Sequence, residues 1–350
     1  MTTEMQHKSL ALSSKPEFAV GLLCHIKAMV DNAKRVVLTA HTHADGDAVG
    51  AVTGLMSVLG RLYPDLNLTP MLPQGCPRQF EWMPGAALIL SGESERERCC
   101  QALAEADMIF VLDLNTPSRL DNLAQPFTQA TGHKILVDHH ISPDQAAFQT
   151  IISDHTISST CELATWLVEA LWGAQAIGSE AATCFYTGMR TDTGGFAYSN
   201  TQPSLYHAAA MLIGTGIDPA EINNRIVNIF SERRLRFYGY AISNCLTVMA
   251  EQHFAYFAIS LDVQRHFGVG YEDMDGLVNY TTLMSDIEFG ALIREEKQRC
   301  KVSLRSKHTD VESIARQLFG GGGHRKAAGA TSTLPLAETV EKLTQYVASR

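Results

Sequence analysis

The chain has 350 residues, of which 45% are apolar and 19% charged, an ordinary balance for a globular protein whose length favours two domains. The formal net charge of −9 argues against a protein that coats nucleic acid generally. No apolar run reaches the roughly 18 residues of a membrane span, and residues 1–10 lack the apolar core of a signal peptide, so no membrane association is expected. The eight cysteines form no CxxC pair, which favours free thiols in a reducing cytoplasm.

The first 200 residues alternate between short apolar runs and helical patterns. Helices are predicted at 46–62, 159–173 and 179–190. Such alternation predicts an α/β domain over 1–202, with a Rossmann-like parallel sheet covered by helices on both faces. The predicted strands are 35–41, 66–72, 108–114, 134–140 and 148–153. The three that lead into the polar groups, 35–41, 108–114 and 134–140, are nearly all apolar, as two-sided burial requires.

A helical connector is predicted over 203–245, followed by a smaller α/β domain over 246–350. Strand-like runs in this domain occupy 246–261, 291–307 and 327–333, and helices are expected at 311–319 and 336–349. The four glycines at 320–323 are interpreted as a loop. Residues 291–330 hold nine Lys or Arg against four Asp or Glu, so the acidic chain has one basic region.

Imidazole and carboxylate side chains follow the predicted strands at their carboxyl ends, where open parallel sheets bind ligands. If the strands are neighbours, these groups converge on one edge of the sheet. They are His41, Asp45 and Asp47 after the first strand, Asp113 at the end of 108–113, the run Asp138, His139 and His140, and Asp192 after a helix.

Clustered carboxylates repel one another, and divalent cations would remove that repulsion. A set of carboxylates and imidazoles without thiols suits Mn²⁺ or Mg²⁺ better than structural zinc. Two such ions, about 3.5–4 Å apart, would activate a water molecule for attack on phosphorus. The small residues Gly46, Ala48 and Gly50 are expected to let the next helix begin close to the ions. Taken singly, each acid has a plainer explanation, such as a helix N-cap or a solvated loop residue.

The ordered motifs resemble those of a known family. HTHADGDA (41–48), FVLDLN (110–115), VDHHIS (137–142) and MRTDTGGF (189–196) are similar to the four motifs of the DHH phosphoesterases. KVSLRSK (301–307) and GGGGHRKAAGA (320–330) look like the DHHA1 substrate-binding domain. Within the family, the length and short connector most resemble the small oligoribonucleases that also dephosphorylate pAp.

The resemblance implies a ligand set for two Mn²⁺ ions, with Mg²⁺ or Co²⁺ as substitutes. His41, Asp45 and Asp113 would hold the first ion, and Asp47, Asp113, His139 and Asp192 the second, with Asp113 bridging. Asp138 would orient a histidine, and His140 would touch the substrate phosphate or help to protonate the leaving oxygen. Ala44 stands where the family commonly has proline, a change that removes no ligand.

The C-terminal domain would grip the nucleotide. The glycine run, Gly321, Gly322 and Gly323, allows backbone N–H groups to approach a phosphate or base closely. Arg305 and His324 are the favoured substrate-binding side chains. Further candidates are Ser303, Arg294, Lys307, Arg325 and Asn279.

The expected activity is hydrolysis of short single-stranded RNA or DNA oligonucleotides, or of pAp to AMP and phosphate, in a cleft between the two domains. The acidic body would repel long polyanions, which favours substrates of about two to five nucleotides. Alternatives are a phosphodiesterase of cyclic or linear dinucleotides, a pyrophosphatase, or a non-catalytic nucleotide-binding module. A homodimer is compatible with the sequence.

Overall fold

The computed structural model describes residues 15–228, 230–274 and 276–349. The chain divides into two compact units, Met1–Ile229 and Phe230–Arg350, which are described separately. The prediction made from residues 1–10 lies outside the described residues. In the part of the chain that is described, no helix is both long and apolar enough to cross a membrane.

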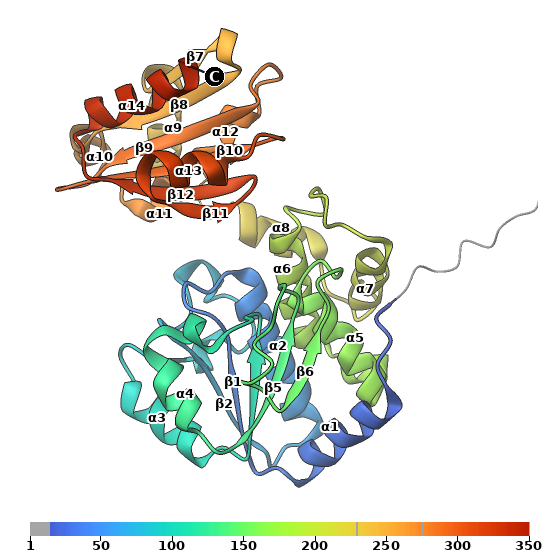
Figure 1. The fold of residues 1–350 in the computed structure, drawn as a ribbon. Helices are drawn as coiled ribbons and strands as arrows, with labels where there is room; N and C mark the ends of the chain where they lie inside the picture. The colour runs from blue at the N-terminus through green and yellow to red at the C-terminus, as the bar shows by residue number, and fades with distance from the viewer. Residues whose placement is uncertain (1–14, 229, 275, 350) are drawn as a thin grey trace, which may run out of the picture. The chain divides into compact units, whose positions relative to one another are not determined.

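Unit 1 is built on a six-stranded parallel sheet with the order β3-β2-β1-β4-β5-β6, which confirms the predicted architecture (Figure 1). The strands are β1 (Arg35–Thr39), β2 (Asn67–Leu72), β3 (Leu90–Ser91), β4 (Met108–Leu112), β5 (His133–Asp138) and β6 (Thr150–Ser153). The sequence did not predict β3, because two residues are too short a run to show a period.

Each central strand sends alternate side chains to two separate cores. Val36 and Leu38 of β1 join the larger core, and Val37 joins the smaller one on the opposite face. The larger core is covered by α1 (Val20–Asn32), α2 (Gly46–Leu62), α5 (Thr160–Trp172), α6 (Ser179–Asp192) and α7 (Pro203–Ile213). The smaller is covered by α3 (Arg96–Glu105), the 3₁₀ helix Pro117–Leu123 and α4 (Ala124–Gln129).

Glycines of α2 allow it to pack closely against α5 and α6. A Cβ added to Gly50 would lie 2.5 Å from the carbonyl oxygen of Cys184 in α6 and 3.0 Å from Sγ of Cys161 in α5. A Cβ on Gly46 would lie 2.5 Å from Oγ1 of Thr191. The small residues of this stretch therefore serve the contact between helices, rather than only the approach of α2 to bound ions as expected.

Unit 2 contains a mixed six-stranded sheet with the order β11-β12-β10-β9-β8-β7, in which only the β8–β9 pair is parallel. α13 (Val311–Phe319) and α14 (Leu336–Ala348) cover one face, and α9 (Glu232–Asn244) covers the other face near β7 and β8. The strands are β7 (Leu246–Met249), β8 (Phe254–Ile259), β9 (Phe289–Glu295), β10 (Cys300–Ser306), β11 (Gly322–His324) and β12 (Ala327–Ser332). Shorter helices are α10 (Leu261–Phe267), α11 (Tyr271–Met274) and α12 (Asn279–Thr282).

Two expectations differ from the structure. The glycine run 320–323 is not wholly a loop, because Gly322 and Gly323 begin β11 and pair with Gly329 and Ala328 of β12. The stretch 203–245 is helical as expected, but it is shared between the units: α7 and α8 (Pro219–Val227) fall in unit 1 and α9 falls in unit 2. The domain boundaries at 202 and 246 stay predictions.

We predict that Gly50→Ala destabilises unit 1 by about 1–3 kcal/mol, because the new methyl group meets a backbone carbonyl that cannot move aside. The matched control is Gly239→Ala in α9, where a Cβ would have nothing within 4 Å. That variant should be neutral or stabilised by about 0.4–1 kcal/mol through helix propensity and unfolded-state entropy. Urea unfolding of both variants measures the difference, and equal midpoint shifts would contradict the packing argument.

Candidate metal centre

The candidate centre lies where the strand order of unit 1 reverses. β1 lies between β2 and β4, and the chain leaves β1 toward β2 but leaves β4 toward β5. The loops that follow β1 and β4 therefore diverge and leave a crevice at the carboxyl ends of these strands. His41 follows β1 and Asp113 follows β4, so both stand at this position.

His41 and Asp45 form the first group with Asp113. His41 is buried, and its Nδ1 lies 2.7 Å from the carbonyl oxygen of Thr42. Because a carbonyl only accepts, Nδ1 carries a hydrogen, and Nε2 is the ring nitrogen that faces the carboxylates. That Nε2 atom is 3.2 Å from Oδ2 of Asp113 and 4.0 Å from Oδ1 of Asp45. Asp45 is also the N-cap of α2, accepting hydrogen bonds from the backbone N–H groups of Asp47 and Ala48, so the plainer role holds as well.

Asp113 is central to the arrangement, and its two carboxylate oxygens face different groups. Oδ2 faces His41, whereas Oδ1 lies 3.6 Å from Nε2 of His139. The Thr160 hydroxyl donates to Oδ1 at 3.0 Å. The Asp113 backbone has a φ of +59°, a left-handed conformation that aspartate tolerates better than most residues, and its N–H donates to Val137 of β5.

Asp47, His139 and Asp192 form the second group. Nε2 of His139 lies 4.0 Å from Oδ2 of Asp47 and 3.6 Å from Oδ2 of Asp192. Asp47 is almost fully buried, and its carboxylate accepts the backbone N–H groups of Thr160 at 2.6 Å and Cys161 at 2.9 Å. These N–H groups belong to the first turn of α5, whose positive dipole end favours a carboxylate.

Asp138 and His140 lie beside these groups. Nδ1 of His140 lies 2.7 Å from Oδ1 of Asp138 and 3.7 Å from Oδ1 of Asp113. Asp138 was predicted to orient a histidine, and the histidine that it contacts is His140. Its other oxygen, Oδ2, is buried and has no hydrogen-bond partner among the described residues. Nε2 of His140 lies 3.2 Å from Nη1 of Arg119.

Burial and mutual repulsion shift the pKa values of the acids in the centre. Burial, reinforced by the charges of Asp113 and Asp192, raises the pKa of Asp47 well above its usual value. Burial and the charges of Asp113 and Asp45 raise the pKa of Asp192 to about 7. Burial opposes ionisation of Asp113 too, but the hydrogen bond with His41 and the neighbouring imidazoles lower the pKa of this central acid. Asp113 is thus the acid that the surroundings keep ionised.

The donor set fits divalent cations. His41, Asp45 and Asp113 form one set of potential ligand atoms within 4.8 Å of one another, and Asp47, His139 and Asp192 form another. Both contain only imidazole nitrogens and carboxylate oxygens, the ligands that suit Mn²⁺, Mg²⁺ and related ions. The nearby Cys161 thiol donates to the carbonyl oxygen of Asp47, and burial raises its pKa well above its usual value, so it is not a thiolate ligand.

The sequence analysis did not predict three groups that contact the residues of the centre: the Thr160 hydroxyl, the N–H of Cys161 and the Arg119 guanidinium. The Ser159–Glu162 pattern in SSTCE is a helix-start signal that predicts α5. It gives no indication that the first turn of that helix lies against Asp47, more than 100 residues earlier. Arg119 stands in an unremarkable 3₁₀ turn, and no spacing rule points to it.

The predicted substrate residues lie on unit 2. Ser303 and Arg305 share one face of β10, opposite Gly329 and Ala327 of β12. Nη1 of Arg305 donates to the carbonyl oxygen of Leu304 at 3.0 Å, which leaves most of its guanidinium donors available. His324 pairs with Ala327 in β11, so the register brings His324 and Arg305 to the same side of the sheet. Arg325 and Asn279 are exposed.

The charged groups of two predicted substrate residues, Arg294 and Lys307, already contact other residues of unit 2. Arg294 is only 7% exposed, pairs with Glu296 at 2.6 Å and lies over the ring of Tyr271. Lys307 donates to the carbonyl oxygens of Met284 and Ser285. Of the glycines, Gly321 packs against Gly329, where a Cβ would lie 2.3 Å from the carbonyl oxygen, whereas Gly322 has open space. Gly321 is thus explained by packing.

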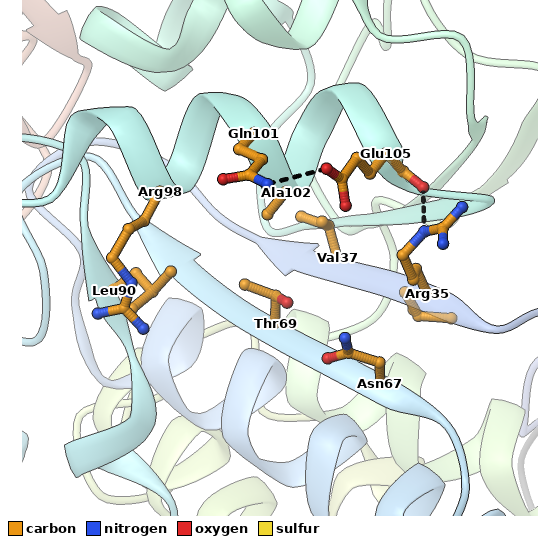
Figure 2. A pocket seen from close by; sticks show the side chains of 10 residues that line it. Arg35, Val37, Asn67, Thr69, Leu90, Arg98, Gln101, Ala102 and Glu105 are labelled. Carbon is orange, nitrogen blue, oxygen red and sulfur yellow. Dashed lines mark hydrogen bonds between the residues drawn. The ribbon is translucent and has the colours of Figure 1, made fainter.

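A pocket of about 200 Å³ lies under α3, at the opposite end of the strands (Figure 2). Its floor includes Arg35 and Asn67, the first residues of β1 and β2, and Arg98, Gln101 and Glu105 of α3 form its wall. None of the predicted site residues lines it. The candidate ligand residues of unit 1 therefore lie at the carboxyl ends of the strands, away from this pocket.

Comparisons with known proteins agree with this geometry. The family model of the DHH family N-terminal domain matches residues 35–189, and the DHHA1 domain model matches residues 252–350. A curated bifunctional oligoribonuclease and PAP phosphatase, NrnA, from Thermus thermophilus is 27% identical over 320 residues, covering 89% of this chain and 89% of its own. The Bacillus subtilis protein of the same name is 26% identical over 300 residues, covering 85% of this chain and 88% of its own.

A solved structure has the same fold over nearly the whole chain. An exopolyphosphatase-related protein from Bacteroides fragilis is 31% identical, with a TM-score of 0.90, and the match covers 96% of this chain and 98% of that one. The ordered motifs, the parallel sheet with His and Asp residues at its switch point, and these likenesses agree. The chain belongs to the DHH phosphoesterase family and carries a C-terminal DHHA1 domain.

Proposed function

We propose that this chain is a hydrolase that uses two divalent cations to cleave phosphoester bonds in short oligoribonucleotides and in pAp. The single observation that carries the proposal is the position of Asp113, whose two oxygens each face a separate group of imidazole and carboxylate ligands. The relatives named as oligoribonuclease and PAP phosphatase support this choice of substrate.

His41, Asp45 and Asp113 would hold the first cation, and Asp47, Asp113, His139 and Asp192 the second. Mn²⁺ is the proposed ion, and Mg²⁺ and Co²⁺ are the proposed substitutes, because the ligands are imidazoles and carboxylates without thiolate. When bound, the cations supply Lewis-acid activation of water and of the phosphoryl group. The protein holds Asp47 by two backbone N–H groups and Asp113 by the Thr160 hydroxyl, which fixes both acids before any ion arrives.

His140 is the proposed group for contact with the substrate phosphate or for proton donation to the leaving oxygen. Its hydrogen bond with Asp138 fixes the orientation of the ring. Burial works against its protonation, but the hydrogen bond with Asp138 and the charges of Asp113 and Asp138 raise the pKa of His140 overall. A raised pKa keeps more of the imidazole in the protonated form that a general acid needs.

The DHHA1 unit is proposed to bind the nucleotide through Arg305, His324 and the glycine-rich strand β11. Arg305 and His324 lie on one side of the sheet, and exposed Gly322 lets a ligand approach the backbone closely. A reducing, cytoplasmic setting is proposed as well, in keeping with eight cysteines that are all unpaired in the described residues.

A substrate panel with one metal at a time tests the proposal. We predict release of mononucleotides from a dinucleotide and of phosphate from pAp, and loss of both activities in EDTA. Asp113→Asn, which tolerates the same backbone conformation, should lower kcat/KM on every substrate by more than the roughly 10–100-fold typical of residues that only support a ligand. Exposed Asp65→Asn is the control. Activity confined to cyclic dinucleotides or to polyphosphate would replace the proposed substrates.

Arg305→Ala should raise KM for nucleotides about 10–100-fold, because a charged hydrogen bond to the substrate is lost. Cleavage of an activated ester, bis-p-nitrophenyl phosphate, should change little, since that compound lacks the groups that unit 2 would grip. Arg299→Ala, a loss of an exposed cation that pairs with Glu296, is the control. An equal loss on both kinds of substrate would contradict the division of labour between the units.

The acids also predict a pH dependence of stability for protein freed of metal. Asp192 keeps its proton in the folded state up to a pKa of about 7 but loses it near 3.8 in the unfolded chain. Between these values the folded state binds more protons, so the free energy of unfolding should fall as pH rises. Asp192→Asn should flatten that fall, and added Mn²⁺ should abolish it. Urea unfolding in EDTA at several pH values measures the slope; a slope that the substitution leaves unchanged would contradict the assignment.

A further inference from the structure

Arg119 is fixed in place beside the candidate centre by its own backbone. It belongs to the 3₁₀ helix Pro117–Leu123 that follows β4. Its carbonyl oxygen accepts the N–H of Thr42 at 2.7 Å, and its N–H donates to Thr116 at 3.1 Å. Thr42 directly follows His41, so the loop after β4 is hydrogen-bonded to the loop that carries the first ligands. The Arg119 side chain therefore starts from a defined position relative to His41 and Asp113.

Among the described residues, the guanidinium of Arg119 has one hydrogen-bond partner, the ring of His140. Nη1 lies 3.2 Å from Nε2 of His140, and Nδ1 of the same ring lies 2.7 Å from Asp138. Since the Asp138 carboxylate only accepts, Nδ1 carries a hydrogen, and Nε2 accepts from Arg119 when the ring is neutral. This contact uses one of the five N–H donors of a guanidinium.

The charge of Arg119 also bears on its role. Within the described part of the chain, no carboxylate lies within 4.0 Å of its guanidinium nitrogens, although acids crowd the centre next to it. Arg294 and Arg299, by contrast, both pair with Glu296. Arg119 thus carries a half-buried positive charge that the protein itself does not neutralise.

We propose that Arg119 binds the phosphate group whose ester is hydrolysed, donating its free N–H groups to the non-bridging oxygens. The inference rests on the proposed function, since it assigns a substrate contact in the same site. The planar fork of donors matches phosphate oxygens, and an arginine without an acidic partner loses no ion pair when it turns to the substrate. Its charge offsets negative charge that gathers on the phosphate as the ester breaks.

The experiment compares Arg119→Ala and Arg119→Lys with the wild type. The control is Arg236→Ala, which removes an exposed arginine that pairs with Glu232 in unit 2. Inorganic phosphate is the probe, and its affinity for the Mn²⁺-loaded protein is measured by calorimetry. We expect Arg119→Ala to weaken phosphate binding about 10- to 100-fold, as the loss of a charged hydrogen bond does, with part of the affinity kept in Arg119→Lys. Metal content, measured by elemental analysis, should stay unchanged.

A purely positioning role for Arg119 makes a different prediction. If the arginine only orients His140, its removal should cost nothing further once that imidazole is gone. His140→Asn keeps an N–H donor for Asp138 and supplies this background. We expect Arg119→Ala to weaken phosphate binding in the His140→Asn background by nearly the same factor as in the wild type. No further loss there, or unchanged binding in the single variant, overturns the proposal.

The binding measurement also separates this inference from the proposed function. Phosphate binding that depends on Arg119, in a protein that hydrolyses none of the panel substrates, would refute the proposed function and leave the contact standing. If the protein hydrolyses the proposed substrates but its phosphate affinity does not depend on Arg119, the proposed function stands and the Arg119 contact is refuted. Unchanged unfolding midpoints for the two Arg119 variants show that the differences do not come from misfolding.

Discussion

The repulsion between acids gathered in a small buried space is the constraint on which the rest of the structure depends. Asp47 and Asp113 are almost fully buried, and their charges act on one another and on Asp192 across a few ångströms. Such a cluster costs stability unless something offsets its charge. The protein supplies part of that offset through the first turn of α5, the Thr160 hydroxyl and the imidazoles. The remainder matches the charge of divalent cations.

The scaffold makes that concentration of charge possible. The reversal of strand order between β1 and β4 opens a crevice without any insertion, and close contacts of α2 with α5 and α6 fix the walls around it. Because Gly50 and Gly188 allow the helices to approach so closely, Asp47 reaches the N–H groups of α5 and Asp192 reaches His139. Rigid packing thus holds the acids in positions that their mutual repulsion would otherwise open.

Much of this arrangement follows from the sequence, for identifiable reasons. The apolar runs of β1, β4 and β5 are long enough to show two-sided burial, and polar residues at their ends follow the rule for parallel sheets. The gathering of His41, Asp113, His139 and Asp192 was predictable because each stands at the end of a regular element. Arg119, Thr160 and the pairing of Gly322 with Gly329 were not. Their partners lie far along the chain, and the local propensity of a segment does not predict contacts with distant segments.

A single carboxylate serves two roles at Asp45. The carboxylate that closes the first turn of α2 also stands 4.0 Å from the imidazole of His41. A serine or an asparagine in its place would keep a good helix start while removing the negative charge, and an alanine would remove both. Substitution of Asp45 is therefore restricted for two reasons. The residue begins the longest helix in unit 1, and its charge belongs to the candidate metal centre. The plain structural explanation of a residue and its functional explanation need not compete.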